Sequence, residues 1–127
     1  MFAEAAPRKP SQAMGLNDRE ADALKPYCKA VATCAAGGVD YVLLTALQLP
    51  GCTPAEPDAL LCLGDRGEGY PTRLFLSQRV TPPRPYALNW NANGVRILER
   101  EWWAFSWRVP AGMTPEETLA HHLGPLR

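Results

Sequence analysis

The sequence lacks a surplus of charge of either sign and lacks long hydrophobic runs. Its 127 residues include 13 Lys or Arg and 13 Asp or Glu, so the formal net charge is zero. A neutral chain attracts neither DNA, RNA nor an anionic membrane, and we expect no nucleic acid and no membrane as partner. No stretch approaches the roughly 18 apolar residues of a membrane span. The N-terminus has no continuous apolar core of a secretory signal, so we expect a cytoplasmic protein.

Paired cysteines and common catalytic motifs are also missing. Cys28, Cys34, Cys52 and Cys62 form no C-x-x-C pair, which disfavours a zinc ribbon or a thioredoxin-like site. Four free thiols are the expected state in a reducing compartment. The sequence has no H-E-x-x-H, no G-x-S-x-G and no glycine-rich phosphate loop. We therefore expect no metal and no organic cofactor.

The composition that remains is that of a globular protein. Apolar residues make up 46% of the chain and charged residues 20%, and this length suits one domain. Residues 1–15, rich in Ala, Pro and polar residues, are predicted to form a flexible tail. A single domain is then expected over residues 16–127.

A helix is predicted directly after the tail. Asn17 can act as its N-cap, and Glu20, three residues on, completes a capping box. Pro26 either ends this helix or begins a second one at its first turn. The pair Gly37-Gly38 is expected to stop whatever helix precedes it.

Three short apolar segments follow and predict β-strands. They span residues 39–49, 59–64 and 72–80. The third segment alternates, with Leu74 and Leu76 on one face and Phe75 on the other. Because the segments are closely spaced, they favour an antiparallel meander of three or four strands over a parallel sheet.

The C-terminal segment predicts a second helix. Thr114 is its expected N-cap, Pro115 its first residue and Glu117 the partner in a capping box. Leu119 and Leu123 lie four residues apart, so they share one face and should dock onto the sheet. The sequence therefore predicts an α+β fold with helices against an antiparallel sheet.

Between sheet and helix lies "NWNANGVRILEREWWAFSW", residues 89 to 107, which contains all four tryptophans. The pair Asn93-Gly94 predicts a type I′ hairpin turn, since both of its central residues need positive φ. Trp102 and Trp103 are adjacent and point to opposite faces of an extended chain, so one should pack inward. Asn89 or Asn91 either holds the local backbone or donates to an oxyanion.

The order of these pieces resembles that of the ubiquitin-conjugating enzyme (UBC) superfamily. Tyr70-Pro71 matches the Tyr-Pro turn, Asn89 matches the last residue of the His-Pro-Asn motif, and Trp107 begins the stretch before the last helix. More narrowly, "GGVDYVLLTALQLP", "DALLCLGDRGEGYPTRLFL" and a spaced "W..FSW" are similar to the prokaryotic family E group of this superfamily. The resemblance covers about residues 37–124.

This resemblance implies a fold, a pathway and partners. The fold would be a UBC-like meander with N- and C-terminal helices and a long active-site flap. Members are thought to work in bacteria beside a ubiquitin-like protein, an activating enzyme and a JAB-type peptidase, often in antiphage or poorly characterised operons. These three proteins are the partners that the resemblance suggests for this chain.

The chain departs from the family at the catalytic cysteine. That residue usually follows the motif asparagine by eight positions and the turn glycine by three, and both counts reach Ile97. A thioester carrier needs a thiolate, which isoleucine lacks. The first hypothesis is therefore a UBC-like protein that binds a ubiquitin-like protein or a conjugation partner. Its candidate contact residues are Tyr70, Pro71, Trp90, Trp102, Trp103, Trp107 and His122.

Two other hypotheses stay open. In the first, the chain is an active conjugating enzyme with a displaced thiol. Cys62 lies in a predicted strand and is expected to be buried, whereas Cys52, in a proline-rich loop, is the more exposed candidate. In the second, it is an unrelated small α+β domain with a structural or hydrolytic role. A hydrolase would pair a serine with a histidine, and the candidates are Ser77, Ser106, His121 and His122.

Overall fold

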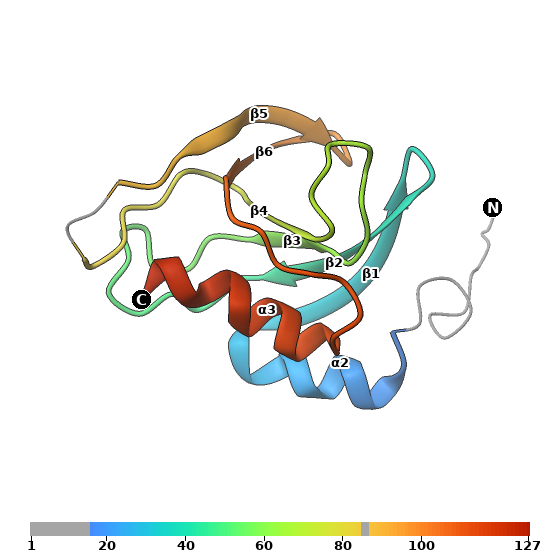
Figure 1. The fold of residues 1–127 in the computed structure, drawn as a ribbon. Helices are drawn as coiled ribbons and strands as arrows, with labels where there is room; N and C mark the ends of the chain where they lie inside the picture. Colours follow the sequence, from blue (N-terminus) through green and yellow to red (C-terminus); the bar gives the residue numbers. More distant parts are fainter. Residues whose placement is uncertain (1–15, 85–86) are drawn as a thin grey trace.

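The computed structural model describes residues 16–84 and 87–127, so the tail expected over residues 1–15 lies outside the described residues. Within them, a six-stranded antiparallel sheet carries two α-helices on one side (Figure 1). The strand order is β1-β2-β3-β4-β6-β5. The α+β class is confirmed, but the sheet has more strands than the three or four expected. The elements are α2 (Asp18–Leu24), the 3-10 turn η1 (Lys25–Tyr27), β1 (Ala30–Ala36), β2 (Val39–Thr45), β3 (Ala59–Cys62), β4 (Arg73–Leu76), β5 (Trp90–Ile97), β6 (Arg100–Phe105), α3 (Pro115–Leu123) and η2 (Gly124–Leu126).

Helix α2 begins as predicted. The Asn17 backbone N–H donates to Glu20 Oε1 at 2.9 Å, and the Glu20 N–H donates to Asn17 Oδ1 at 2.8 Å. The two bonds satisfy N–H groups that the first turn of a helix leaves unpaired. The helix ends at Leu24, and Pro26 lies in the 3-10 turn that follows.

The next segment differs from the prediction. Gly37-Gly38 does not end a helix: residues 30–36 form strand β1, which pairs with β2 along its whole length. Both glycines have positive φ, 58° and 79°, and form the hairpin turn between the strands. The alanine-rich composition favours a helix, but pairing with an apolar neighbouring strand overrides that local preference.

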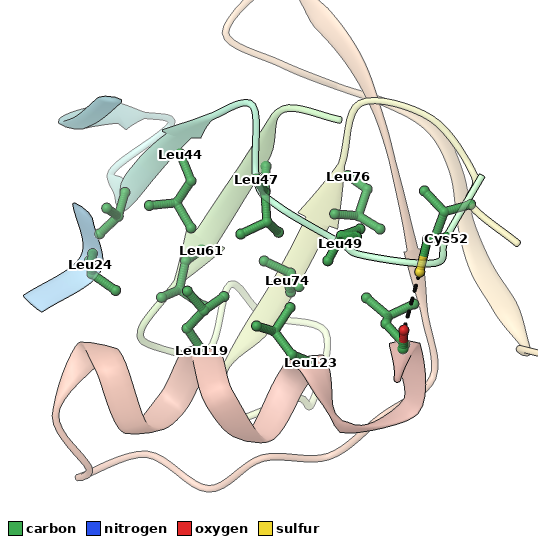
Figure 2. Close-up of a cluster of buried hydrophobic side chains, with 14 of the residues drawn as sticks. Leu24, Leu44, Leu47, Leu49, Cys52, Leu61, Leu74, Leu76, Leu119 and Leu123 are labelled. Carbon is green, nitrogen blue, oxygen red and sulfur yellow. Dashed lines mark hydrogen bonds between the residues drawn. The ribbon is translucent and has the colours of Figure 1, made fainter. Parts of the chain in front are cut away.

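The central strands place their side chains on two faces. Leu74 and Leu76 lie in one buried cluster, and Phe75 lies in the other, as the alternation predicts. The first cluster fills the space between the sheet and the helices (Figure 2). There Leu119 and Leu123 of α3 are at most 2% exposed, which confirms the predicted docking of the C-terminal helix. The Thr114 capping box of that helix is also present.

The predicted flap is a β-hairpin that extends the sheet. Its turn is not at Asn93-Gly94: the two residues between β5 and β6 are Leu98 and Glu99, with φ of 54° and 63°. Gly94 instead lies where the register shifts within β5, at an irregularity of the β-bulge kind. The expected turn position was therefore wrong by five residues along the chain.

The hairpin is held mainly by its side chains. Strand β6 pairs with β4 only at Leu76 and Trp103. Trp102 has no exposed surface, and it packs with Tyr41, Phe75 and other residues of the second cluster. The hairpin lies on the side of the central strands opposite the helices (Figure 1). As predicted, one of the adjacent tryptophans points inward.

The turn position follows from this packing. The Trp102 indole N–H donates to the carbonyl oxygen of Ile97 at 2.9 Å. Ile97 is the last residue of β5, so this bond holds the two strands together next to the turn. A turn at Asn93-Gly94 would shift the pairing of β5 with β6 and remove Ile97 from the buried cluster. Burial of two large apolar side chains outweighs the local preference of an Asn-Gly pair.

Replacing Trp102 with phenylalanine should destabilise the protein far more than the same change at Trp107. Trp102→Phe loses the hydrogen bond to Ile97 and leaves a cavity, at a cost of about 2 kcal/mol or more. Trp107 is 43% exposed, and Trp107→Phe should cost about 1 kcal/mol or less. Urea unfolding measures both values. Equal losses would contradict the burial of Trp102.

Candidate functional site

The loop before β4 presents the Tyr-Pro turn in a fixed shape. The Asp65 carboxylate accepts backbone N–H bonds from Gly67, Glu68 and Gly69 at 2.7, 3.1 and 3.2 Å. These bonds, first that from Gly67, hold the pKa of Asp65 below its usual value. Gly67 and Gly69 have φ of 96° and 87°, a conformation that glycine adopts without strain. The loop therefore holds the backbone before Tyr70 in one conformation and fixes the position of this residue.

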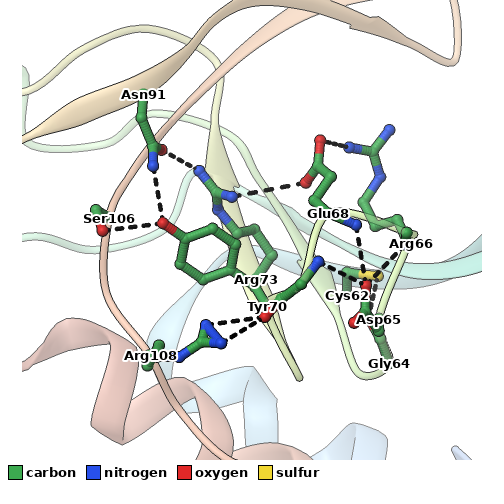
Figure 3. A network of polar contacts seen from close by, with 12 residues as sticks. Cys62, Gly64, Asp65, Arg66, Glu68, Tyr70, Arg73, Asn91, Ser106 and Arg108 are labelled. Carbon is green, nitrogen blue, oxygen red and sulfur yellow. Dashed lines mark hydrogen bonds and ion pairs between the residues drawn. The ribbon is translucent and has the colours of Figure 1, made fainter.

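The Tyr70 hydroxyl joins this loop to the hairpin (Figure 3). It accepts a hydrogen bond from Asn91 Nδ2 at 2.8 Å and shares one with Ser106 Oγ at 2.9 Å. The guanidinium carbons of Arg73 and Arg108 lie 4.0 and 5.2 Å from the ring centroid. The hydrogen bonds with Ser106 and Asn91, together with the two cations, lower the pKa of Tyr70.

Arg73 supports this arrangement from inside the protein. It is 3% exposed, donates through Nη2 to Asn91 Oδ1, and lies with Nη1 3.6 Å from Glu68 Oε1. Its Nε is buried and has no hydrogen-bond partner within the described residues. Burial lowers the pKa of Arg73. Arg66 also pairs with Glu68, at 2.7 Å, and donates to the Tyr41 hydroxyl at 2.8 Å.

His122 links the base of the turn to helix α3. Its Nε2 lies 2.9 Å from Thr72 Oγ1, and Thr72 Oγ1 also donates to the Val109 carbonyl at 2.8 Å. A hydroxyl has one hydrogen to give, so the proton between His122 and Thr72 must be on Nε2. Burial, together with Arg73 and His121, lowers the pKa of His122 to about 4. His122 is therefore neutral at pH 7, and at 2% exposure it is not a surface contact residue in this structure.

The aromatic residues proposed as partner contacts fall into separate groups. Trp102 belongs to the core. Trp90 and Trp103 are half-buried, and Trp90 packs edge-on against Phe105 with ring centroids 5.4 Å apart. Trp107 is exposed, and its indole N–H donates to the His121 carbonyl at 3.0 Å. Only some of the seven predicted contact residues thus offer surface to a partner.

Three of the candidates, Tyr70, Pro71 and Trp107, lie on two neighbouring segments. Arg108 donates to the Gly69 carbonyl at 2.8 and 2.7 Å, so residues 106–108 run beside the Tyr-Pro turn. Tyr70 and Pro71 are half-buried there, and Trp107 and Arg108 are exposed. We call these four residues, Tyr70, Pro71, Trp107 and Arg108, the Tyr-Trp patch.

The cysteines lack the features of a nucleophile. Cys62 is buried, as predicted, with no exposed surface. Cys52 is the more exposed of the two, as expected, but at 5% it is buried as well, and its thiol donates to the Leu126 carbonyl at 3.2 Å (Figure 2). The loop that carries it folds under the end of the chain. Cys28 and Cys34 are half-buried. Burial raises the pKa of all four thiols.

Asn89 and Ile97 are not brought together. Asn89 is exposed just before β5. Its backbone carbonyl oxygen accepts a hydrogen bond from the backbone N–H of Ser106 at 2.7 Å. Ile97 is 4% exposed at the far end of β5, roughly 26 Å away along the chain at about 3.3 Å per residue. Of the two asparagines considered, Asn91 is the one that contacts the Tyr-Pro turn.

The serines and the buried histidine of the hydrolase hypothesis are hydrogen-bonded to other residues and not to each other. Ser106 Oγ bonds Tyr70, and Ser77 Oγ accepts the Asp58 backbone N–H at 3.0 Å. The partner of His122 is Thr72. Each of these three side chains is thus hydrogen-bonded to a group other than the serine or histidine with which the hypothesis pairs it.

Sequence reasoning missed Arg73 and Thr72. One signal for Arg73 was available, because it shares the face of Phe75 in an otherwise apolar strand, where a charge needs buried partners. Nothing in the sequence indicates that Thr72 meets His122, since 50 residues separate them.

Within residues 16–84 and 87–127, no three His, Cys, Asp or Glu side chains gather to hold a metal ion. In the same residues no helix is long and apolar enough to cross a membrane. No protein-family model, no curated protein and no solved structure matches the chain.

Stability should fall with acidity because of His122. Its pKa is about 4 in the folded protein and about 6.5 when unfolded, so the unfolded chain binds more protons between these values. The stability contributed by neutral His122 is complete above pH 6.5 and is lost as the pH falls toward 4. We expect a loss of about 2 kcal/mol between pH 7.5 and 5.0.

Urea unfolding at both pH values measures this loss of unfolding free energy. The His122→Gln variant should lose much less stability between the two pH values, whereas His121→Gln, changed at an exposed position, should lose as much as the wild type. An unchanged pH dependence in His122→Gln would show that other groups are responsible.

Thiol labelling should be slow in the native protein. In a Cys28→Ser/Cys34→Ser variant, the remaining Cys52 and Cys62 should react with a disulfide reagent only as the protein unfolds, because both are buried. The measured rate should rise with urea. A fast phase in native buffer would contradict the burial of Cys52.

Proposed function

We propose that the chain is a UBC-like protein, similar to the prokaryotic family E group, that works in a bacterial ubiquitin-like conjugation pathway in the cytoplasm. It binds a ubiquitin-like protein or another component of the pathway and forms no thioester. The order of elements supports this proposal: a helix, a meander, a Tyr-Pro turn between β3 and β4, the segment with the tryptophans, and a final helix.

The observation that carries the proposal is the state of the thiols. All four cysteines are described, all have a raised pKa, and Cys52 and Cys62 are buried. Thioester exchange needs an accessible thiolate with a lowered pKa. The position reached by counting from the family motif holds Ile97, inside the core. Recognition is the function that such a scaffold can still perform.

The Tyr-Trp patch is the proposed contact surface. Trp, Tyr and Arg are the residue types that most often dominate binding energy at interfaces, and the patch contains one of each. Its loop is fixed by Asp65, and its tyrosine by Asn91 and Ser106. Binding to such a preorganised surface loses little conformational entropy.

Two features depart from the expected pattern. The tryptophan segment is a paired hairpin that extends the sheet, whereas the resemblance implies a long active-site flap. The sheet also has two more strands than a four-stranded meander. The hairpin lies in the region that would carry the catalytic cysteine, so the first departure agrees with loss of thioester chemistry rather than with loss of recognition. Strand β1, one of the added strands, lies at the opposite edge of the sheet.

A reconstitution experiment tests the proposal. The protein is mixed with ATP and with a ubiquitin-like protein and an activating enzyme of the kind that the resemblance suggests, and run on a non-reducing gel. Binding to the ubiquitin-like protein, the activating enzyme and the JAB-type peptidase is measured separately by calorimetry. We expect binding to at least one of them, no reductant-labile adduct, and an affinity weakened at least about tenfold by Trp107→Ala.

Matched arginines provide the control. Arg108→Ala removes a patch residue, whereas Arg96→Ala removes an exposed arginine from β5, and only the first should weaken binding. A reductant-labile adduct that disappears in Cys52→Ser or Cys62→Ser would instead support a displaced-thiol enzyme. If the protein forms no adduct and also binds none of these proteins, a role in this pathway is refuted.

A further inference from the structure

Within residues 16–84 and 87–127 no segment pairs with the outer edge of strand β1, and we infer that this edge pairs with β1 of a second copy of this chain. Strands β1 and β5 are the two edges. An exposed edge offers unpaired backbone donors and acceptors to another chain unless charges, prolines or bulges block it. The two edges of this protein differ in these features.

Strand β5 carries the blocking features. Its register shifts twice, between Trp90 and Ala92 and between Asn93 and Val95, and it includes the charged residue Arg96. Strand β1, by contrast, pairs residue by residue with β2 from Ala30 to Ala36 without a shift. It contains neither a charged residue nor a proline.

The side chains of β1 leave its backbone accessible. Ala30, Ala32, Thr33 and Ala35 are exposed, and each is small. Beside the strand, a groove of about 140 Å³ runs along α2, with Leu16, Ala21 and Val31 among its lining residues. An added strand would cover apolar surface of this groove as well as pair with the backbone.

Self-complementarity identifies the second copy as the occupant. In an antiparallel pair centred on Thr33, each residue faces the one equally far from Thr33 on the other strand. Thr33 then faces Thr33, a pairing that stabilises sheets. Lys29, the nearest charge before the strand, faces Gly37, where even an added Cβ would meet no atom within 4 Å. No like charges are opposed anywhere along the pair.

This inference goes beyond the proposed function and does not depend on it. Two strands, β2 and β3, separate β1 from the strand that follows the Tyr-Pro turn. A dimer formed through β1 therefore adds a second interaction surface to that proposed at the Tyr-Trp patch.

Sedimentation over a roughly hundredfold range of protein concentration tests the inference. The chain should form a concentration-dependent dimer, and Thr33→Lys, which opposes two lysines, should weaken it at least about tenfold. Ala111→Lys adds the same charge at an exposed loop position and should leave the dimer unchanged. A monomer at every concentration, or equal weakening by both variants, would overturn the proposal.

Crosslinking tests the register independently of stability. Under mild oxidation Thr33→Cys should form a disulfide-linked dimer well above the wild-type level, because the two introduced thiols face each other. Ala30→Cys should not, because Ala30 would face Ala36. Equal crosslinking of the two variants, with native circular dichroism in both, would also refute this pairing.

Discussion

Burial of Trp102 is the interaction on which the rest of the structure depends. The hairpin that carries it meets β4 through a single residue pair, so backbone pairing alone holds it weakly. The indole, with no exposed surface, fixes β6 against the second face of the sheet, and its N–H fixes the hairpin end at Ile97. Once the hairpin is held in this way, Asn91 and Ser106 reach the Tyr70 hydroxyl. The candidate site is thus a consequence of core packing.

The polar groups around Tyr70 show the same dependence. Arg73 is buried only because Asn91 and Glu68 satisfy part of its guanidinium, and Asn91 comes from the hairpin. An isolated buried charge would be too costly to keep. His122 adds a neutral link from the base of the turn to α3. These contacts tie the Tyr-Pro turn to three elements, and Trp107, on the neighbouring segment, stays exposed.

The sequence indicates those parts of the fold that local rules decide. Capping residues marked the starts of both helices, and alternation placed Leu74 and Phe75 on opposite faces. Predictions from the sequence were wrong where packing between segments distant in the chain determines the local structure. Alanines favoured a helix over β1, and Asn93-Gly94 favoured a turn that burial of Trp102 forbids. For the site, the Tyr-Pro turn and Trp107 could be named from the sequence, and a charge in the apolar strand was an available signal for Arg73. Thr72 could not be named, because its partner His122 lies on another element.

Amide hydrogen exchange, followed with and without the ubiquitin-like protein, tests the central claim most directly. If the hairpin is a fixed part of the sheet and the Tyr-Trp patch is the contact surface, the paired amides of residues 90–105 are protected in the free protein. Added protection on binding then appears over residues 69–71 and 106–109. Rapid exchange throughout residues 90–105, or new protection confined to the segments around Cys52 and Cys62, would contradict it.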